Sequence, residues 1–353
     1  MRIHGGSVRA RLDFSVNTNP LGPPEELYRV LIGSCAPEDI LKRYPDYSYR
    51  DLRRSLSEFY GIDEDSLLPL NGSSEGFTLA LLAFRPRRVL SIEPTFGDHM
   101  LACRSLGIES TYIQYKERGD RFILGEEDLA DLESLCRDPY TMIYMSNPNN
   151  PTGSYIDIEK LYRSLDRCRG YIVIDEAYAE LCDICPLKPV GPPENVVILR
   201  SLTKWLSIPG IRLGFLYSSS KRVLRVFDDI RPPWNVNSIA ECVISKLLAR
   251  YSVEMKSFIE RSRGYIAGER GFLLESLRGA GVPKVYRSVA NYILTWFGDK
   301  AEGILDKLVG RGISLRDCSS FTGLGKGYLR ISVRVRRDNE ELITAIRDLL
   351  RAR

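Results

Sequence analysis

Histidine is scarce in this sequence, which has only His4 and His99 among its 353 residues. Two histidines cannot form a three-histidine zinc site, and the HExxH motif of zinc peptidases is absent. A Ser-His-Asp hydrolase is also disfavoured, because only His99 lies in the body of the chain. We therefore predict no metal site, and we expect lysine, arginine, aspartate or a cofactor to carry the chemistry.

A strong charge of one sign is missing as well. The chain has 50 Lys and Arg against 46 Asp and Glu, a net charge of +4, and this gives no basic footprint for nucleic acid. The densest basic stretch, residues 334–337 (Arg-Val-Arg-Arg), is typical of a strand end and a solvated loop, with phosphate binding as the less favoured alternative. We expect no nucleic-acid partner.

Long apolar runs and repeated cysteine pairs are also absent. The longest apolar stretches, such as Phe77 to Phe84, are far too short to span a bilayer, and no signal-like run follows Met1. The one CxxC, Cys182 to Cys185, has no second pair to complete a zinc site, and Pro186 argues against a redox helix. These features predict a soluble cytoplasmic protein with reduced thiols and no membrane contact.

Short apolar runs alternate with helical patterns from about residue 70. A helix is expected at Glu126 to Cys136, where Leu129, Leu132 and Leu135 share one face. Strands are expected at 89–92, 111–115, 142–145, 171–174, 196–199 and 213–217. This alternation predicts an α/β fold, with a mostly parallel sheet flanked by helices.

The pattern changes after Pro232 and Pro233. A long helical region, 238–277, is followed by a smaller set of alternating strands and helices. We predict three parts: a loop-rich N-terminal segment that joins the domains (1–45), a large domain (46–235) and a smaller C-terminal α/β domain (236–353).

Polar residues follow four of the apolar runs, and ligands bind beyond the carboxyl ends of strands in open parallel sheets. Each piece has an ordinary alternative: Asp175 could cap a helix, 147–153 could be a turn and Lys204 could be a solvated lysine. Together they predict a binding site. The segments are Glu93-Pro94-Thr95-Phe96, residues 146–153 (Ser-Asn-Pro-Asn-Asn-Pro-Thr-Gly), Asp175-Glu176-Ala177-Tyr178 and Arg200-Ser201-Leu202-Thr203-Lys204.

Pyridoxal 5′-phosphate accounts for this combination. A lysine can form a Schiff base with its aldehyde, a carboxylate can keep its pyridine nitrogen protonated, and an aromatic ring can stack on it. Residues 71–75 (Asn-Gly-Ser-Ser-Glu) precede an apolar helical run, so N–H groups and hydroxyls at a helix N-terminus offer a phosphate site. Ser201, Thr203 and Arg212 add two hydroxyls and a cation.

Over essentially its whole length, the chain resembles fold-type I pyridoxal-phosphate enzymes of the class I/II aminotransferase superfamily. The resemblance rests on residues 146–153, on Asp175-Glu-Ala-Tyr178, and on Ser201-Leu-Thr-Lys204 with Arg212-Leu-Gly eight residues later. It implies a large sheet of the seven-stranded type and a smaller C-terminal domain.

The resemblance also implies roles for single residues. Lys204 would form the Schiff base, Asp175 would pair with the pyridine nitrogen, and Phe96 would stack on the ring. Asn150 and Tyr178 would bond the ring oxygen. The cofactor phosphate would be held by Gly72, Ser73, Ser74, Ser201, Thr203 and Arg212.

Two further residues are implied to act beyond the cofactor of their own subunit. Tyr44, in Arg43-Tyr44-Pro45-Asp46, is similar to a tyrosine that reaches the partner's phosphate, which implies a homodimer with shared active sites. Arg330 resembles the arginine that clamps a substrate carboxylate through two parallel hydrogen bonds.

Within the superfamily the chain is similar to the branch that holds threonine-phosphate decarboxylases and histidinol-phosphate aminotransferases. The decarboxylase opening is matched by His4-Gly5-Gly6 and by residues 12–22, and Leu315-Arg316-Asp317-Cys318 is similar too. The resemblance implies that Arg316, Asn17 and His4 hold a substrate phosphate. Ser73 departs from the decarboxylase pattern, which has an acidic residue there, and Ser7 replaces an asparagine.

The resemblance leaves three functions to consider. We expect an L-threonine O-3-phosphate decarboxylase of cobamide side-chain synthesis, which acts on a phosphorylated small molecule. The first alternative is a histidinol-phosphate aminotransferase or a related enzyme with the same cofactor residues. The second is a non-catalytic protein that keeps the fold, and the retention of Lys204, Asp175 and both substrate arginines argues against it.

Overall fold

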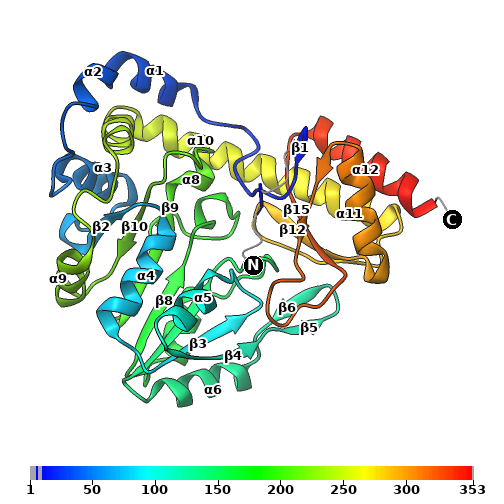
Figure 1. Cartoon of the computed structure of the whole chain (residues 1–353), viewed down its shortest axis with the longest axis horizontal. Helices are drawn as coiled ribbons and strands as arrows, with labels where there is room; N and C mark the ends of the chain where they lie inside the picture. Colours follow the sequence, from blue (N-terminus) through cyan, green and yellow to red (C-terminus); the bar gives the residue numbers. More distant parts are fainter. Residues whose placement is uncertain (1–4, 7–9, 352–353) are drawn as a thin grey trace.

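The large sheet of the protein has seven strands. The structure is a computed structural model that describes residues 5–6 and 10–351. The strand order is β2-β10-β9-β8-β7-β3-β4, and only β10 in this sheet runs antiparallel to its neighbours. The predicted α/β fold is confirmed (Figure 1). The strands are β2 (Leu67–Leu70), β3 (Arg88–Glu93), β4 (Glu109–Gln114), β7 (Thr141–Ser146), β8 (Tyr171–Asp175), β9 (Val196–Ser201) and β10 (Gly214–Tyr217).

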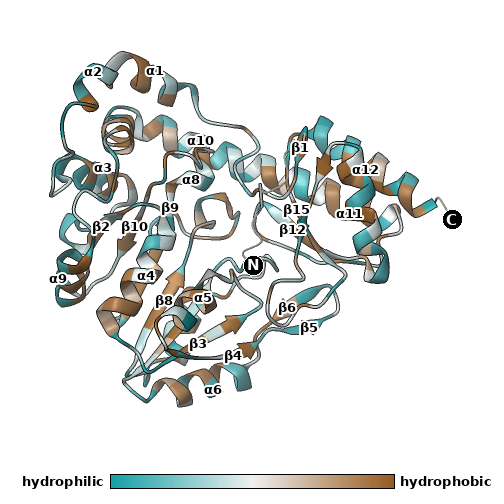
Figure 2. Ribbon diagram, viewed as in Figure 1, coloured by the Kyte–Doolittle hydropathy of each residue, from teal (hydrophilic) through white to brown (hydrophobic). Residues whose placement is uncertain are grey.

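Helices cover both faces of this sheet, whose strands are among the most hydrophobic segments in Figure 2. Successive side chains of a strand point to opposite faces, so Val173 belongs to one core and Ile172 to the other. The Val173 core includes residues of α4 (Ser73–Phe84) and α9 (Lys221–Ile230). The other core receives side chains from α3 (Arg50–Tyr60), α6 (Glu126–Cys136), α7 (Ile158–Ser164) and α8 (Leu202–Trp205). Helix α5 (Asp98–Ser105) follows β3.

The C-terminal part has its own sheet, with the order β11-β12-β15-β14. Helices α11 (Ala301–Gly310) and α12 (Arg336–Arg351) share a separate core with this sheet. Strand β13 (Ile313–Ser314) pairs in parallel with β1 (Leu12–Asp13), so the N-terminal segment is joined to the C-terminal part. The strands are β11 (Lys284–Val285), β12 (Tyr292–Trp296), β14 (Arg316–Asp317) and β15 (Tyr328–Ser332).

One long helix, α10 (Ser238–Gly279), links the two parts: it packs on α1 (Glu25–Ser34) and α3, and farther along on α12. Helix α1 lies in the segment predicted to be loop-rich, because Leu27 and Val30 give a short stretch of it a buried face. The domain boundaries at 45 and 235 stay predictions. The remaining elements are α2 (Pro37–Ile40), β5 (Lys116–Arg118), β6 (Arg121–Ile123) and the 3-10 turns η1 (Glu64–Ser66), η2 (Ala179–Leu181) and η3 (Gly298–Lys300).

The basic stretch 334–337 runs into the start of α12. Arg334 pairs with Asp338 at 2.8 Å and Arg336 with Glu269 at 2.9 Å. Two of its three cations therefore have carboxylate partners, and the second half of the stretch is helical where a loop was expected.

Over the described residues, no helix combines the length and the apolar character that crossing a membrane requires.

Six of the eight cysteines are paired in disulfides, so the prediction of reduced thiols is wrong for them. The pairs are Cys35–Cys242, Cys136–Cys168 and Cys182–Cys185, whereas Cys103 and Cys318 are buried free thiols. Cys35 and Cys242 lie 207 residues apart, and only the packing of α1 on α10 brings them together.

Candidate active site

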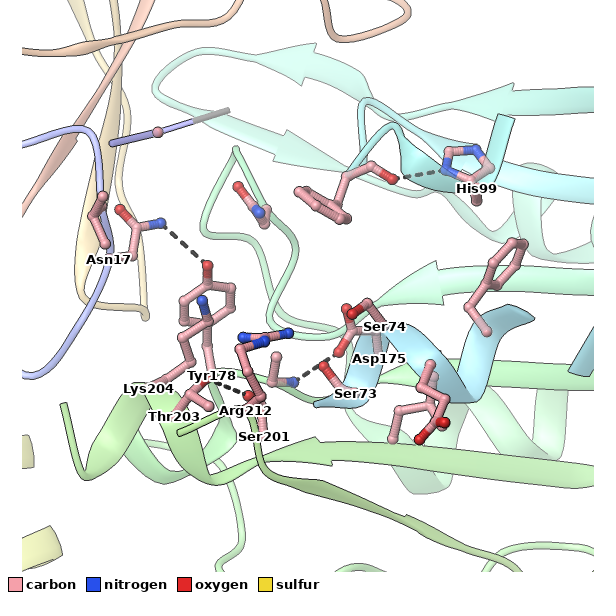
Figure 3. Close-up of a pocket in the computed structure, with 18 of the residues that line it drawn as sticks. Asn17, Ser73, Ser74, His99, Asp175, Tyr178, Ser201, Thr203, Lys204 and Arg212 are labelled. Atoms are coloured by element: carbon pink, nitrogen blue, oxygen red, sulfur yellow. Dashed lines mark hydrogen bonds between the residues drawn. The ribbon is translucent and has the colours of Figure 1, made fainter. Parts of the chain in front are cut away.

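One cavity of about 720 Å³ collects most of the predicted site residues, and its volume is usual for a small-molecule site. It lies at the sheet edge where β2, β7, β8 and β9 end and β10 begins, so segments far apart in the sequence meet there. Figure 3 shows Lys204, Asp175 and Ser73 arranged around it. The predicted residues that line it are Asn17, Ser73, Ser74, Phe96, Asn150, Asp175, Tyr178, Ser201, Thr203, Lys204, Arg212, Arg316 and Arg330.

Asp175, the last residue of β8, contributes a carboxylate to this cavity, which Glu75 also lines. Its Oδ1 accepts a hydrogen bond from the backbone N–H of Ala177 at 3.0 Å. Burial raises the pKa of Asp175 from 3.8 to about 6, and the Glu176 charge adds to the rise, while the Ala177 N–H, the Lys204 ammonium and the Tyr144 hydroxyl lower it. A cation placed against this carboxylate would favour its charged form. Asp175 is therefore suited to a protonated ring nitrogen.

Lys204 lies in α8, directly after β9, and its Nζ is 5.7 Å from the centre of the Tyr178 ring. The Tyr178 hydroxyl is 3.4 Å from the amide of Asn17. The surrounding donors place the amide oxygen of Asn17 toward Arg330, with Nε at 3.2 Å and Nη1 at 3.1 Å. The N-terminal segment, β15 and the large sheet thus meet beside the lysine.

The turn between β2 and α4 forms an anion site. Gly72 has φ +79°, and a Cβ there would lie 2.5 Å from Arg212 Nη2, so only glycine lets this turn approach the guanidinium. Ser73 begins α4, whose first N–H groups have no acceptor within the helix. The Ser201 and Thr203 hydroxyls lie 2.8 Å apart on the cavity wall. A guanidinium, several hydroxyls and free N–H groups together suit a phosphate.

The C-terminal sheet contributes two arginines to the cavity. Arg316 on β14 and Arg330 on β15 are directly opposite each other in the antiparallel register, and both are buried. Arg330 Nη1 donates to Asn150 Oδ1, and Nη2 donates to the Ser15 carbonyl at 2.8 Å. Arg316 Nη2 donates to Ser320 Oγ at 3.2 Å. This wall is suited to an anionic substrate.

Of the predicted residues that the structure describes, Gly72 and Tyr44 do not line the cavity. Gly72 lies just behind it, between the lining residues Asn71 and Ser73. Tyr44 is 77% exposed and stacks on Trp234, with ring centres 4.4 Å apart, so a single chain does not bring it to the site. His4 lies outside the described residues.

His99 and Tyr144 line the cavity, and the sequence reasoning did not assign either to the site. His99 is 1% exposed, with Nε2 2.9 Å from Glu93 Oε1 and Nδ1 2.7 Å from the Phe96 carbonyl. It was considered only as a metal ligand or a triad base, although its position three residues after Phe96 was an available signal. Tyr144 was missed because it lies inside β7, before the strand end.

The fold and this cavity define a class of protein: an α/β enzyme whose lysine, carboxylate and phosphate cradle serve a bound cofactor. The sequence profile described as aminotransferase class I and II matches residues 10–347. The chain belongs to this family.

The relatives include enzymes of two reaction types. A histidinol-phosphate aminotransferase of Caldanaerobacter subterraneus subsp. tengcongensis is 30% identical, over 98% of this chain and 94% of that protein. A threonine-phosphate decarboxylase of Salmonella typhimurium is 28% identical, over 98% of this chain and 96% of that protein. Among solved structures, the histidinol-phosphate aminotransferase from Clostridium acetobutylicum has a TM-score of 0.84 and 26% identity, covering 96% of this chain and 98% of that chain.

Enzymes of this family depend on pyridoxal 5′-phosphate, and this chain is such an enzyme. Its cavity fits the cofactor on structural grounds. The Gly72 turn leaves space in front of Arg212 that a Cβ would fill, and the cavity lining offers an amine, a half-buried carboxylate and a phosphate cradle. The predicted fold, enzyme class and cofactor are confirmed.

Proposed function

We propose that the protein is an L-threonine O-3-phosphate decarboxylase that acts in cobamide side-chain synthesis in the cytoplasm. The observation that carries this proposal is the pair Arg316 and Arg330, buried opposite each other on neighbouring strands of the cavity wall. Residues directly opposite in antiparallel strands have Cα atoms roughly 5 Å apart. Threonine phosphate has two anionic groups, a carboxylate and a phosphate, and two adjacent guanidinium groups can bind one each.

The cofactor, when bound, supplies an electron sink for the bond that breaks at the substrate Cα. The amine of Lys204 would attach the cofactor, and Asp175 would keep the ring nitrogen protonated. Tyr178 and Asn150 would donate to the ring oxygen, and Phe96 would stack on the ring. The phosphate would be held by Ser73, Ser74, Ser201, Thr203 and Arg212, and Gly72 would provide the turn that lets Arg212 come close.

The substrate residues would decide which bond at Cα breaks, because they would fix the orientation of the substrate toward the electron sink that the cofactor supplies. Arg330 would hold the carboxylate and Arg316 the phosphate, and the proposal assigns Asn17 and His4 to the phosphate as well. If the two arginines present the Cα–carboxylate bond for cleavage, carbon dioxide would leave and the Lys204 ammonium would return a proton to Cα. If they present the Cα–H bond, the Lys204 amine would remove that proton and amino transfer would follow.

A histidinol-phosphate aminotransferase is the second candidate, favoured by Ser73. Relatives named for each of the two activities are 30% identical to this chain, so identity favours neither candidate. Histidinol phosphate has a phosphate and no carboxylate. It would use Arg316, and Arg330 would bind the carboxylate of the keto acid in the other half of the reaction. The two candidates therefore differ in whether turnover requires a keto acid.

We propose in addition that the protein is a homodimer. Large apolar side chains lie exposed around Trp234: Tyr44 and Tyr47 contact its ring, and both are at least half exposed. Ile32 and Leu41, on the neighbouring N-terminal helical segment, are 81% and 72% exposed. Apolar surface of this kind favours cover by a partner, and a second copy would let Tyr44 reach the partner's phosphate cradle. Sedimentation of Trp234→Arg should give a monomer, and an unchanged dimer would contradict this interface.

The reaction is tested by supplying O-phosphothreonine to the enzyme with and without 2-oxoglutarate. The proposal predicts carbon dioxide and 1-aminopropan-2-yl phosphate in equal amounts, at a rate that the keto acid does not change. Glutamate formation without carbon dioxide would refute it, and turnover of histidinol phosphate only with the keto acid would support the second candidate. Lys204→Ala is the control and should make neither product.

A further inference from the structure

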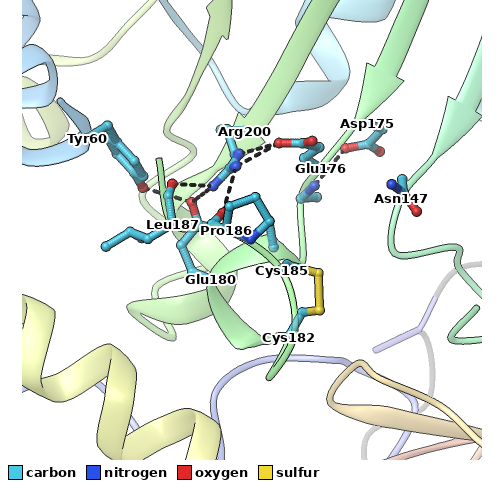
Figure 4. Close-up of polar contacts among 12 residues, drawn as sticks. Tyr60, Asn147, Asp175, Glu176, Glu180, Cys182, Cys185, Pro186, Leu187 and Arg200 are labelled. Atoms are coloured by element: carbon cyan, nitrogen blue, oxygen red, sulfur yellow. Dashed lines mark hydrogen bonds and ion pairs between the residues drawn. A yellow bond between two sulfur atoms is a disulfide. The ribbon is translucent and has the colours of Figure 1, made fainter. Parts of the chain in front are cut away.

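Behind the cavity wall, β9 carries a buried arginine to which no cofactor or substrate role is given. Arg200 has 0% exposure and directly precedes Ser201. Figure 4 shows its guanidinium between the carboxylates of Glu176 and Glu180. These three buried residues form what we term the Arg200 cluster.

The cluster is held by directed hydrogen bonds. Arg200 Nε donates to Glu176 Oε2 at 2.7 Å, and Nη1 donates to Glu180 Oε1 at 3.0 Å. The other contacts are to the Leu187 carbonyl at 3.2 Å and the Pro186 carbonyl at 3.4 Å. The same Glu180 oxygen accepts from the Tyr60 hydroxyl at 2.9 Å. A guanidinium can serve these four acceptors at once because its donors point in fixed, different directions.

The two carboxylates of the cluster bracket the residues that face the cofactor. Glu176 directly follows Asp175, and Glu180 comes shortly after Tyr178. The pairing of β8 with β9 ends at Asp175, and one further bond, from the Glu176 N–H to the Leu199 carbonyl at 2.8 Å, follows it. Beyond that point the chain leaves the sheet toward η2. The hydrogen bonds of Arg200 to Glu176 and Glu180 then connect this segment to β9.

We propose that Arg200, through Glu176 and Glu180, holds the segment that carries Asp175 and Tyr178 against β9 and so positions both residues relative to Lys204. Arg200 is thus a positioning residue. The inference rests on the cofactor roles proposed for Asp175 and Tyr178, and it applies equally to decarboxylation and amino transfer.

The charges of the cluster also act on Asp175. Burial raises the pKa of Glu176, and Arg200 opposes this rise. An ionised Glu176 in turn raises the pKa of Asp175, which Lys204 and Tyr144 lower; the phenol of Tyr292 is a further titratable neighbour. Neutralising Glu176 should therefore let Asp175 stay ionised to lower pH, whereas neutralising Glu180 should affect Asp175 less.

The first test replaces the guanidinium of Arg200, with its several directed donors, but keeps the positive charge. Arg200→Lys cannot serve two carboxylates and two carbonyls together, so its dissociation constant for pyridoxal 5′-phosphate, titrated into apoenzyme by absorbance, should rise about tenfold or more. Arg270→Lys is the matched control: Arg270 is also buried and donates to Asp183 Oδ2 at 2.6 Å and to the Ala290 carbonyl at 3.1 Å. Wild-type affinity in Arg200→Lys, or an equal loss in Arg270→Lys, would overturn the proposal.

A second pair of variants tests the positioning role of the Arg200 cluster even if Arg200→Lys does not fold. Glu176→Gln and Glu180→Gln each remove one negative charge and keep the shape. For each, the ratio of variant to wild-type dissociation constant, taken from pH 8 to pH 5, cancels the titration of the cofactor itself. The ratio for Glu176→Gln should fall toward low pH, and that for Glu180→Gln should stay nearly flat. Because the positioning role requires both variants to bind the cofactor more weakly than the wild type, ratios of one at every pH would refute the proposal.

One further variant separates this inference from the cofactor roles on which it rests. Asp175→Asn should weaken cofactor binding and abolish the pH dependence assigned to Asp175. If Asp175→Asn binds the cofactor as the wild type does, the role of Asp175 is wrong, whatever Arg200 does. If it binds weakly while the Arg200 and Glu176 variants behave as the wild type, only the positioning proposal fails.

Discussion

Replacing Asp175 by asparagine should stabilise the apoenzyme while it weakens cofactor binding. Burial raises the pKa of Asp175 from 3.8 to about 6, so the folded state holds its proton more tightly than the unfolded state. At 1.36 kcal/mol for each pH unit, this difference corresponds to a penalty of about 3 kcal/mol for the ionised form. The carboxylate is partly exposed to the cavity, so about 3 kcal/mol is the upper value.

The sign of the effect gives the pH window. Below pH 3.8 Asp175 is protonated in both states and carries no penalty. As the pH rises from 3.8 to about 6, Asp175 loses its proton more readily in the unfolded state, so the free energy of unfolding falls. Above pH 6 the carboxylate is ionised in both states and the whole penalty applies. Asp175→Asn removes the charge and keeps an oxygen for the Ala177 N–H, so the stability it gains over the wild type should be near zero at pH 4 and largest at pH 8.

Urea unfolding of both apoenzymes at pH 4, 6 and 8 measures this gain. Asp306→Asn, at an exposed position of α11, is the control and should give no pH-dependent gain. If the variant is as stable as the wild type at pH 8, or less stable, then the ionised Asp175 does not destabilise the apoenzyme, and the reasoning is refuted. The affinity for pyridoxal 5′-phosphate should fall in the same variant, because asparagine cannot pair with a protonated ring nitrogen.

Three further predictions concern the cradle, the substrate wall and the thiols. Gly72→Ala should weaken cofactor binding about tenfold, measured by titration, because its Cβ would displace Arg212 and its φ is +79°. Arg330→Lys should raise KM for O-phosphothreonine about tenfold, since an ammonium cannot bond a carboxylate through two parallel N–H groups; an unchanged KM would exclude the clamp. Thiol titration of the unfolded protein should find two thiols without reductant and eight after reduction, and eight in both would contradict the disulfides.

The cofactor half of the site could be predicted from local sequence. Parallel strands present their carboxyl ends at one edge of a sheet, so the residues after β7, β8 and β9 had to meet wherever that sheet formed. Asp175 and Lys204 were found in this way without knowledge of the strand order. The glycine turn at Gly72 was also readable, because its place before a helix signals an anion site.

The substrate half could be named only through resemblance, and its geometry came from the fold. Arg316 and Arg330 are neighbours because β14 and β15 pair in one register, and a shift of one residue would turn one of them away. The disulfide between Cys35 and Cys242 depends on the packing of α1 against α10 in the same manner. Arg200 was visible only as part of a strand end, and its partners became clear once Glu176 and Glu180 were seen around it.

The scarcity of histidine, the alternating apolar runs and the polar strand ends determined the fold class and the chemistry of the cofactor, because each is a local property of the chain. The tertiary structure decided which cations share a wall, which cysteines pair and which buried charges support Asp175. Those relations join residues far apart in sequence, and only packing and strand register bring them within a few ångströms of one another.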